Sequence, residues 1–414
     1  MKINLTKLKR EFPYEIYILF INTVMIVDLL RMIVPSAGVL GIVRNGLYLL
    51  SLIYMFYHAI HHRHSTIIVM LGTYYVFLAA LSCLQNVGLF RVILSESLIF
   101  LSRCVVGFYF AYYIPVNDIF LKKIKKYFVI LIIYCVLYMS THTLGLYATD
   151  GSYMTFSYNI LIMVMLWILL TVYNPTILRV IGTIAFVCII VVYGARGPLL
   201  CIAVSFGLFL LYKFADSSVW KKILQIILCV VGSFSIVSAK NIILDFLLTL
   251  NPESRTLYLL KNSNLDALSG RDIYYEVLKN KINQNWILPH GIYSDRLALA
   301  SGSSTSSNLD LSAFYAHNLP MEIMYQFGAV FGCILLLLLL FKVVSSYHLL
   351  FKLKDYKYAI VYCAFFTGIT TLFFSSSYLI NERFWLALGL IFGIRQRVLF
   401  KENTDRLDVK KTDS

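Results

Sequence analysis

Long runs of apolar residues, separated by short polar segments, follow one another along almost the whole chain. Most runs are about 20 residues long, the length of α-helix that crosses the hydrocarbon core of a bilayer. They are continuous rather than alternating, so they predict membrane-spanning helices and not the strands of a membrane β-barrel. The pattern predicts about twelve spans, at residues 13–34, 38–58, 66–84, 94–115, 127–146, 156–173, 178–195, 197–214, 222–239, 319–341, 357–376 and 379–396.

One polar segment, residues 240–318, is far longer than any other connection. It divides the chain into four parts: nine predicted spans (1–239), a large outer loop with short helices (240–318), three further spans (319–398) and a charged cytoplasmic tail (399–414). We expect the tail to be disordered. The predicted fold class is an all-α polytopic membrane protein.

Composition supports this class. Hydrophobic residues make up 59% of the chain and charged residues 14%, against about 25% charged residues in an ordinary soluble domain. All eight cysteines lie inside apolar runs and none lies in 240–318. They are therefore expected to be packing residues rather than a disulfide framework.

The net charge of +15 fits a membrane topology better than a nucleic-acid partner. Lysines and arginines cluster in alternate loops, which places both termini on the cytoplasmic side. Segment 240–318 carries seven basic and seven acidic residues, so it is neutral and is predicted to lie outside. The surplus charge is read as a topology signal, and no nucleic acid is expected.

The first candidate for chemistry is Arg196, in the tight outer turn between the seventh and eighth predicted spans. Gly197 and Pro198 break the helix there. An arginine at this depth is costly unless it meets an anion or a partner. Gly194 and Gly197 remove bulk beside it, which favours a ligand over the alternative, an arginine that snorkels to the interface.

The second candidate is Arg271, in the outer loop. Ser269 and Asp272 have the spacing of a capping box, which predicts a helix start. Arg271 would then lie in the first turn, where free amides and an arginine form a phosphate site. The alternative is a surface arginine paired with Asp272 or Glu276. The apolar residues of this helix are predicted to share one face: Ile273, Val277, Leu278 and Ile282.

The third candidate is His317, where the loop enters the tenth predicted span. Asn318 suits the N-cap and Pro320 the first turn. The helix dipole disfavours a charged imidazole, so His317 is expected to be neutral and able to accept a proton. A structural histidine at a helix start is the alternative. Together, the three candidates on one membrane face indicate transfer from a phosphate-linked donor.

Other polar groups add to this picture. Arg103 is one of four ionisable residues in or near spans, with Asp28, Arg31 and Glu96, that are expected to pair or to line a cavity. Arg383, beside Asn381, could join the pocket. The chain has no Asp-x-Asp motif, so no metal site and no cofactor are expected. His58, His61, His62 and His64 have helical spacing that could bind a metal, but they lie on the cytoplasmic side.

These motifs resemble those of the O-antigen polymerase (Wzy-type) and O-antigen ligase superfamily. Arg196 with Leu199 and Leu200 resembles its Arg-x-x-Leu turn, and Ser269-Gly270-Arg271 resembles the arginine motif of its large periplasmic loop. His317-Asn318, followed by Glu322, Gly328 and Gly332, resembles its His-Asn motif. The order of the motifs, the loop and the topology agree over nearly the whole chain.

The resemblance implies a GT-C-type glycosyltransferase fold in a bacterial inner membrane, with a periplasmic active site. The donor would be an oligosaccharide on undecaprenyl diphosphate, and transfer would be metal-independent and inverting. Arg196 and Arg271 would hold the diphosphate, and His317 would act as general base or orient the acceptor. Further substrate contacts would come from residues near these motifs: Asn318, Glu322, Tyr193, Tyr275, Arg383 and Arg103.

Two acceptors are compatible with this resemblance. A polymerase would extend a second lipid-linked repeat unit, of O-antigen or capsule, and could work with a chain-length regulator protein. A ligase would transfer to lipid A–core. The Tyr- and Phe-rich, motif-poor spans favour a polymerase. Outside the enzyme class, the alternative is a polysaccharide flippase or other transporter, but the sequence shows no internal repeat of the kind common in transporters.

Overall fold

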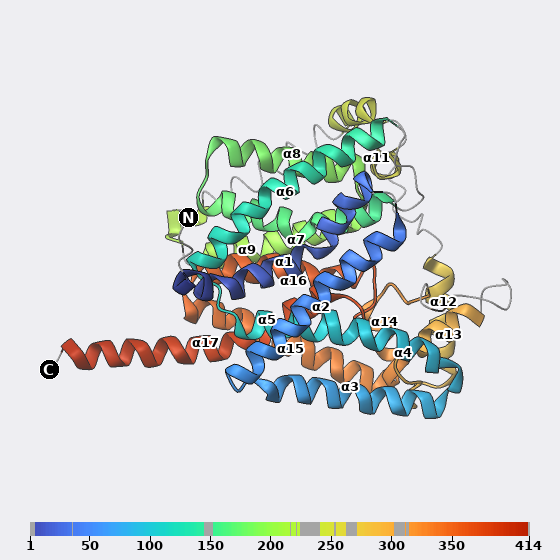
Figure 1. The fold of residues 1–414 in the computed structure, drawn as a ribbon. Helices are drawn as coiled ribbons and strands as arrows, with labels where there is room; N and C mark the ends of the chain where they lie inside the picture. The colour runs from blue at the N-terminus through green and yellow to red at the C-terminus, as the bar shows by residue number, and fades with distance from the viewer. Residues whose placement is uncertain are drawn as a thin grey trace.

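The computed structural model describes residues 5–34, 36–144, 152–215, 217–220, 222–223, 241–251, 254–261, 271–301, 311 and 314–412. All regular structure in these residues is helical (Figure 1). The helices of the first half are α1 (Leu5–Ile33), α2 (Ala37–His61), α3 (Ser65–Gln85), η1 (Val87–Leu89), α4 (Phe90–Ile99), η2 (Phe100–Val105), α5 (Val106–Tyr113), α6 (Asp118–Thr143), α7 (Ser152–Tyr173), α8 (Ile177–Tyr193) and α9 (Arg196–Ala215). Those of the second half are α11 (Arg255–Lys261), α12 (Arg271–Gln284), α13 (Ser294–Ser301), α14 (Leu319–Phe327), α15 (Ala329–Leu353), α16 (Tyr356–Thr371) and α17 (Glu382–Thr412).

Several of these helices are long and apolar enough to cross a bilayer. In the described residues there are six: α1 from Arg10, α2, α3, α7, α9 and α15. The chain is therefore a helical protein of membrane type. The other predicted spans, where described, coincide with helices that are shorter, interrupted or more polar. The ninth, 222–239, lies almost wholly outside the described residues.

Two spans predicted as continuous helices are interrupted. Span 94–115 contains the π-helix η2, a form that usually occurs as short insertions at functional positions. Span 319–341 breaks at Gly328, which has a φ of +77°. Only glycine adopts this backbone freely, and a Cβ at Gly328 would also collide with the carbonyl of Ile287. The backbone between α14 and α15 thus requires glycine at this position.

The C-terminal residues correct a further prediction. Instead of ending near residue 398, α17 continues as one helix to Thr412. Residues 399–412 contain neither proline nor glycine, and their lysine, glutamate, arginine and leucine residues are good helix formers. High charge alone therefore did not predict disorder here.

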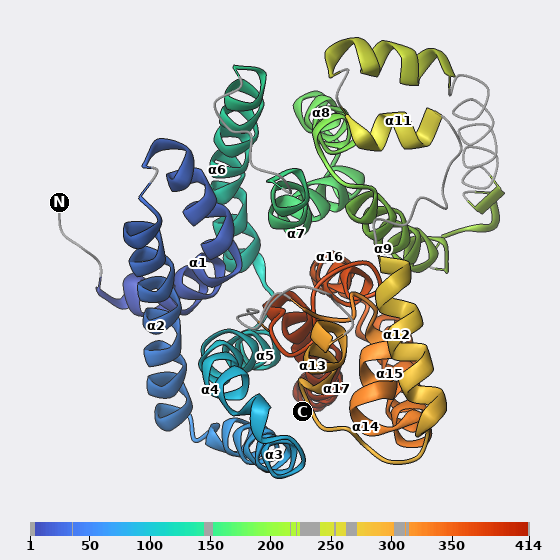
Figure 2. The same cartoon turned by 90° about the vertical axis from the view of Figure 1, so that its right-hand side faces the viewer.

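The centre of the bundle is formed by α5, α16 and α17 (Figure 2). Glycines let these helices approach closely, as in many membrane bundles. A Cβ at Gly389 of α17 would collide with the Phe108 carbonyl of α5, and one at Gly368 of α16 would collide with the Arg383 carbonyl. The start of α17 is therefore held deep among its neighbours.

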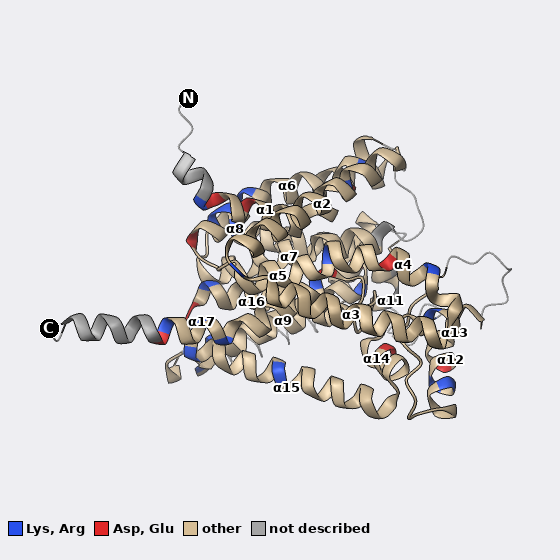
Figure 3. Ribbon diagram, turned by 60° about the horizontal axis from the view of Figure 1, so that its bottom comes forward, with Lys and Arg blue, Asp and Glu red and all other residues tan. Residues whose placement is uncertain are grey.

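The two ends of the bundle differ in charge. Figure 3 shows lysine and arginine gathered at the end where the two termini lie, and α12 and α13 at the opposite end. At the first end, Lys123 of α6 pairs with Glu11 and Lys357 with Asp118, at 2.7 Å and 2.6 Å. The polar loop helices and the basic clusters thus occupy opposite ends, which is the arrangement that the loop charges predict.

Candidate active site

Arg196 and Arg271, 75 positions apart in the sequence, line one pocket. Its volume is about 330 Å³. The walls come from α7, α9, α11, α12 and the connection between α16 and α17. The lining residues are Met154, Tyr158, Ala195, Arg196, Gly197, Leu199, Leu200, Leu260, Arg271 and Phe374. Two arginines in the lining of a largely apolar pocket suit a ligand that has both an anionic and an apolar part.

Hydrogen bonds from neighbouring segments fix the turn before Arg196. The Ala195 amide donates to Ser157 Oγ of α7 at 3.1 Å. The Thr256 hydroxyl of α11 donates to the Gly194 carbonyl at 2.7 Å. Arg196 then begins α9, where free amides and the helix dipole add positive potential. The arginine is therefore presented from a rigid turn.

The two glycines of this turn have a different role from the one predicted. A Cβ at Gly197 would collide with the hydroxyl of Tyr158, and one at Gly194 would collide with the Ile190 carbonyl. Protein atoms, not ligand space, fill the places left by the missing side chains. The glycines allow α7 to pack against the turn, which brings Tyr158 into the pocket wall.

Arg271 is the first residue of α12, and its side chain is tied to another part of the bundle. Its Nη1 donates to the Phe374 carbonyl at 2.5 Å. Among the described residues Arg271 forms no ion pair, and both Asp272 and Glu276 are exposed. Ser269, predicted to cap this helix, lies outside the described residues. The predicted apolar face is wrong at Ile273, which is 61% exposed, because Tyr274 packs inward in its place.

His317 lies just before α14 with a φ of +52°, a conformation rare for residues other than glycine. Asn318 is the N-cap, as predicted: its Oδ1 accepts from the Met321 amide at 3.1 Å. The imidazole packs against the rings of Tyr315 and Tyr274, with centroids 4.1 Å and 6.4 Å away. Its Nδ1 is buried and has no hydrogen-bond partner in the described part of the chain. Such a group is costly unless water or a ligand satisfies it.

The protonation state of His317 ties it to Arg271. Burial, with a further contribution from the Arg271 charge, lowers the pKa of His317 from its ordinary 6.5 to about 4. The histidine is therefore neutral at physiological pH. The sequence predicted a neutral imidazole but attributed it to the helix dipole, whereas burial and Arg271 are the causes. His317 and Arg271 belong to one electrostatic unit beside the pocket.

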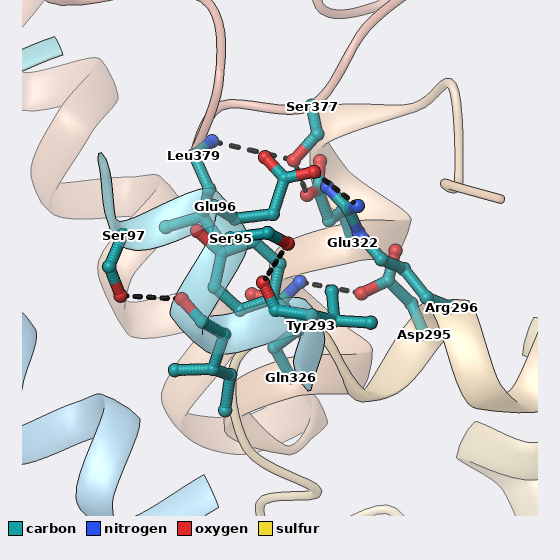
Figure 4. Close-up of polar contacts among 12 residues, drawn as sticks. Ser95, Glu96, Ser97, Tyr293, Asp295, Arg296, Glu322, Gln326, Ser377 and Leu379 are labelled. Atoms are coloured by element: carbon teal, nitrogen blue, oxygen red, sulfur yellow. Dashed lines mark hydrogen bonds and ion pairs between the residues drawn. The ribbon is translucent and has the colours of Figure 1, made fainter. Parts of the chain in front are cut away.

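Glu322, predicted to contact substrate, lies in a buried polar network (Figure 4). It is 1% exposed and accepts a hydrogen bond from Ser377. In the same network Arg296 of α13 forms an ion pair of 2.9 Å with Glu96 of α4, and Gln326 donates to Asp295 at 2.7 Å. Burial raises the pKa of Asp295. The network attaches helix α13, from the long polar segment, to the bundle.

The four remaining predicted residues are not part of the pocket lining. Tyr193 packs against His142, with centroids 5.3 Å apart, and is not part of the pocket lining. Tyr275 is half-buried on α12. Arg383 donates to Asn159 Oδ1 at 2.9 Å, next to Tyr158 of the pocket wall. Arg103 lies 4.6 Å above the Tyr48 ring.

The predicted pairing of intramembrane charges is confirmed only in part. Asp28 and Arg31 form an ion pair of 3.5 Å, but Glu96 pairs with Arg296 rather than with Arg103. In the described residues, no group of three His, Cys, Asp or Glu side chains could hold a metal ion. The sequence also missed Tyr158, Asn159 and Phe374. They are ordinary span or loop residues, and only tertiary contacts mark them.

Comparison with protein-family models, with curated proteins and with solved structures finds no match for this chain. The interpretation of the site therefore depends on its motifs and geometry.

Proposed function

We propose that this protein is a glycosyltransferase that polymerises lipid-linked oligosaccharide repeat units, of O-antigen or capsule, at the periplasmic face of a bacterial inner membrane. One observation carries the proposal. Arg196 and Arg271 line the same pocket, and the charge of Arg271 helps to keep His317 neutral. The proposed topology has about twelve spans, both termini in the cytoplasm and a GT-C-type fold.

In this mechanism the donor is an oligosaccharide on undecaprenyl diphosphate. Arg196 and Arg271 hold the diphosphate in the ground state and bind it more strongly as negative charge develops. Two arginines can neutralise a leaving diphosphate without a metal ion. The apolar lining of the pocket, which includes Leu199, Leu200 and Leu260, suits the first isoprene units of the carrier.

His317 serves the acceptor. A neutral imidazole takes the proton from the acceptor hydroxyl as that oxygen bonds to the anomeric carbon. The bond from the anomeric carbon to the diphosphate oxygen breaks, and its electron pair leaves on the diphosphate. Attack opposite the leaving group inverts the anomeric centre. The ring of Tyr315 packs against the imidazole, with Tyr274 farther away, and so limits its orientation.

The test uses purified protein and lipid-linked repeat units, with products resolved as a ladder on a gel. His317→Ala should abolish the ladder, with a loss of about 10²–10⁴ in rate, and leave donor binding intact. Arg196→Ala and Arg271→Ala should weaken both donor binding and turnover, and lysine should rescue only in part because the planar fork is lost. Matched controls are His290→Ala, a second outer-loop histidine that contacts Tyr325, and Arg91→Ala, an exposed arginine of α4.

Each outcome separates the alternatives. A ladder formed without any other protein supports a polymerase, and the ladder should persist in excess EDTA. Transfer only onto added lipid A–core would indicate a ligase. Transfer to neither acceptor, with full activity of the His317 variant in cells, would favour a transporter. A ladder that is lost in EDTA and restored by Mg²⁺ would contradict the metal-independent mechanism.

A further inference from the structure

A second group of arginines lies outside the lining of the pocket. It consists of Arg31 of α1, Arg44 of α2, Arg103 of η2 and Arg383 of α17, and is called here the four-arginine cluster. Arg103 lies over the ring of Tyr48, which follows Arg44 by one helical turn on α2. The charge of Arg44 is within electrostatic reach of Arg103 and Arg31, which repel it, and of Asp28, which attracts it.

The carboxylates near the cluster do not balance its charge. Asp28 lies 3.5 Å from Arg31 and also accepts from Asn159. Glu382 lies 4.0 Å from Arg383. Arg44 and Arg103 form no ion pair with any carboxylate in the described residues. Four guanidinium groups against two carboxylates leave two positive charges in excess.

Two buried polar atoms in the cluster lack partners. Nε of Arg44 and the hydroxyl of Tyr48 are both buried without a hydrogen bond among the described residues. An unpaired polar atom in a protein interior costs about 1–3 kcal/mol. These atoms and the excess charge would both be satisfied by an anion with several acceptor oxygens.

The position of Arg103 makes an unused cluster costly. It lies in the helical segment of α4, η2 and α5, inside the bundle of apolar helices. Uncompensated arginines within membrane helices are rare unless they pair or serve a function. The N-terminus of α17 adds positive potential there through the helix dipole. Asn381 caps this helix by accepting from the Arg383 amide at 3.0 Å. The same N-terminus lies against Gly107 of α5, where a Cβ would be 3.1 Å from the Glu382 carbonyl oxygen.

We propose that the four-arginine cluster binds a second phosphate-bearing lipid headgroup, separate from the one in the Arg196–Arg271 pocket. Neighbouring residues of α7 divide the two sites. Tyr158 lines the pocket, whereas Asn159 binds Arg383 and Asp28. Adjacent helical positions point about 100° apart, so Tyr158 and Asn159 direct their side chains toward the two anion sites separately.

The identity of this second headgroup rests on the proposed function. In polymerisation both substrates carry a lipid-linked diphosphate, and one pair of arginines cannot hold both. The acceptor reacts at the sugar farthest from its own lipid. Its diphosphate must therefore lie about one repeat unit away from the reacting carbon, in a separate site. The cluster is assigned to the acceptor diphosphate.

The test measures how many lipids bind, using undecaprenyl diphosphate without sugar and purified protein in nanodiscs, counted by native mass spectrometry. The wild-type protein should bind two copies. Arg44→Gln with Arg103→Gln should leave one, and so should Arg196→Gln with Arg271→Gln. A matched control, Lys279→Gln with Arg91→Gln, removes two exposed outer basic residues and should keep both. One copy in the wild type, or two in the Arg44 and Arg103 variant, would overturn the proposal.

Further arms identify the source of the headgroup and guard against misfolding. If excess phosphatidylglycerol displaces the second copy, the occupant is bulk phospholipid and the acceptor assignment is wrong. If the double variant unfolds, Arg44→Gln alone, at a partly buried residue, repeats the test. This variant should weaken binding of the second copy at least tenfold. Where transfer is measurable, the Arg44→Gln variant should have a raised KM for the acceptor and an unchanged KM for the donor. Two bound copies in a protein that performs no transfer would sustain the second site and refute the proposed function instead.

Discussion

The hydroxyl of Tyr158 occupies the place where the side chain of residue 197 would be if that residue were not glycine. The contact joins α7 to the start of α9 and forms one wall of the pocket. We predict that Gly197→Ala displaces Tyr158, lowers stability by about 1–3 kcal/mol and reduces transfer. The measurements are thermal unfolding in detergent and initial rates.

Gly207 provides the control on the same helix. A Cβ at this position meets no atom within 4 Å. Gly207→Ala should change stability by no more than about 1 kcal/mol, in the stabilising direction expected for alanine in a helix, and should leave transfer unchanged. Equal effects at both positions would show that the Tyr158 contact is unimportant.

The pH dependence of transfer tests the role of His317. A base must be neutral to accept a proton, and the pKa of His317 is lowered to about 4 by burial and by Arg271. Transfer should therefore persist as pH falls past 6.5 and decline only near 4. Single-turnover rates measured between pH 4 and pH 6.5 would show where transfer declines. Arg271→Gln should move the midpoint of the residual activity to higher pH, because it removes a repelling charge; a wild-type midpoint near 6.5 would argue against this environment.

The same shift affects stability, with the sign set by linkage. The folded-state pKa of about 4 is below the ordinary 6.5, so the unfolded chain takes up the proton first as pH falls. The contribution of His317 to the free energy of unfolding is therefore fully present above pH 6.5. It is lost as the pH falls from 6.5 to 4. His317→Gln should flatten the pH dependence of unfolding in this window, while transfer is lost at every pH.

The buried pair of Arg296 and Glu96 should be intolerant of single changes. Both side chains are at most 5% exposed. Removal of one partner from a buried ion pair typically costs about 3–5 kcal/mol, because the other charge stays buried. Arg296→Met should therefore lower the unfolding temperature sharply, and Glu96→Leu combined with it should recover much of the loss.

An exposed pair provides the reference for that experiment. Lys261 and Asp245 are 2.6 Å apart, with side chains 45% and 56% exposed. Lys261→Met should cost no more than about 1 kcal/mol. If Lys261→Met lowered stability as much as Arg296→Met, burial would not determine the cost of breaking an ion pair.

The proposed topology predicts which residues an impermeant reagent can label. Single cysteines at Lys279 of α12 and Lys122 of α6, in a cysteine-free background, should react in intact spheroplasts at the first position only. Both positions are exposed, whereas the adjacent Lys123 is buried and would be silent on either side. Labelling at Lys122 alone would place all three candidate residues in the cytoplasm.

Local sequence signals predicted much of the helical architecture because the length of an apolar run is enough to identify a spanning helix. The Asn318 cap was also predictable from local sequence, because its hydrogen-bond partner is only three residues away. The close approach of the Ile287 carbonyl to Gly328 was not predictable, because it joins residues about 40 positions apart.

The candidate site divides in the same way. Arg196, Arg271 and His317 were identified by the motifs around them, but their association depends on contacts that no local pattern specifies. Arg296 was missed altogether. It occurs in a polar loop, and its burial depends on Glu96, 200 positions away.

The attachment of α13 has a consequence for how such proteins diversify. The Ser82 hydroxyl of α3 accepts a hydrogen bond from the Ile292 amide at 2.7 Å, and Glu96 of α4 receives Arg296. A chimaera that exchanged only residues 240–318 between two such proteins would bring a guanidinium into a recipient that lacks its carboxylate. Exchange of the loop would succeed when it is inherited together with the helices that receive it, so α3, α4 and the loop would evolve as one unit.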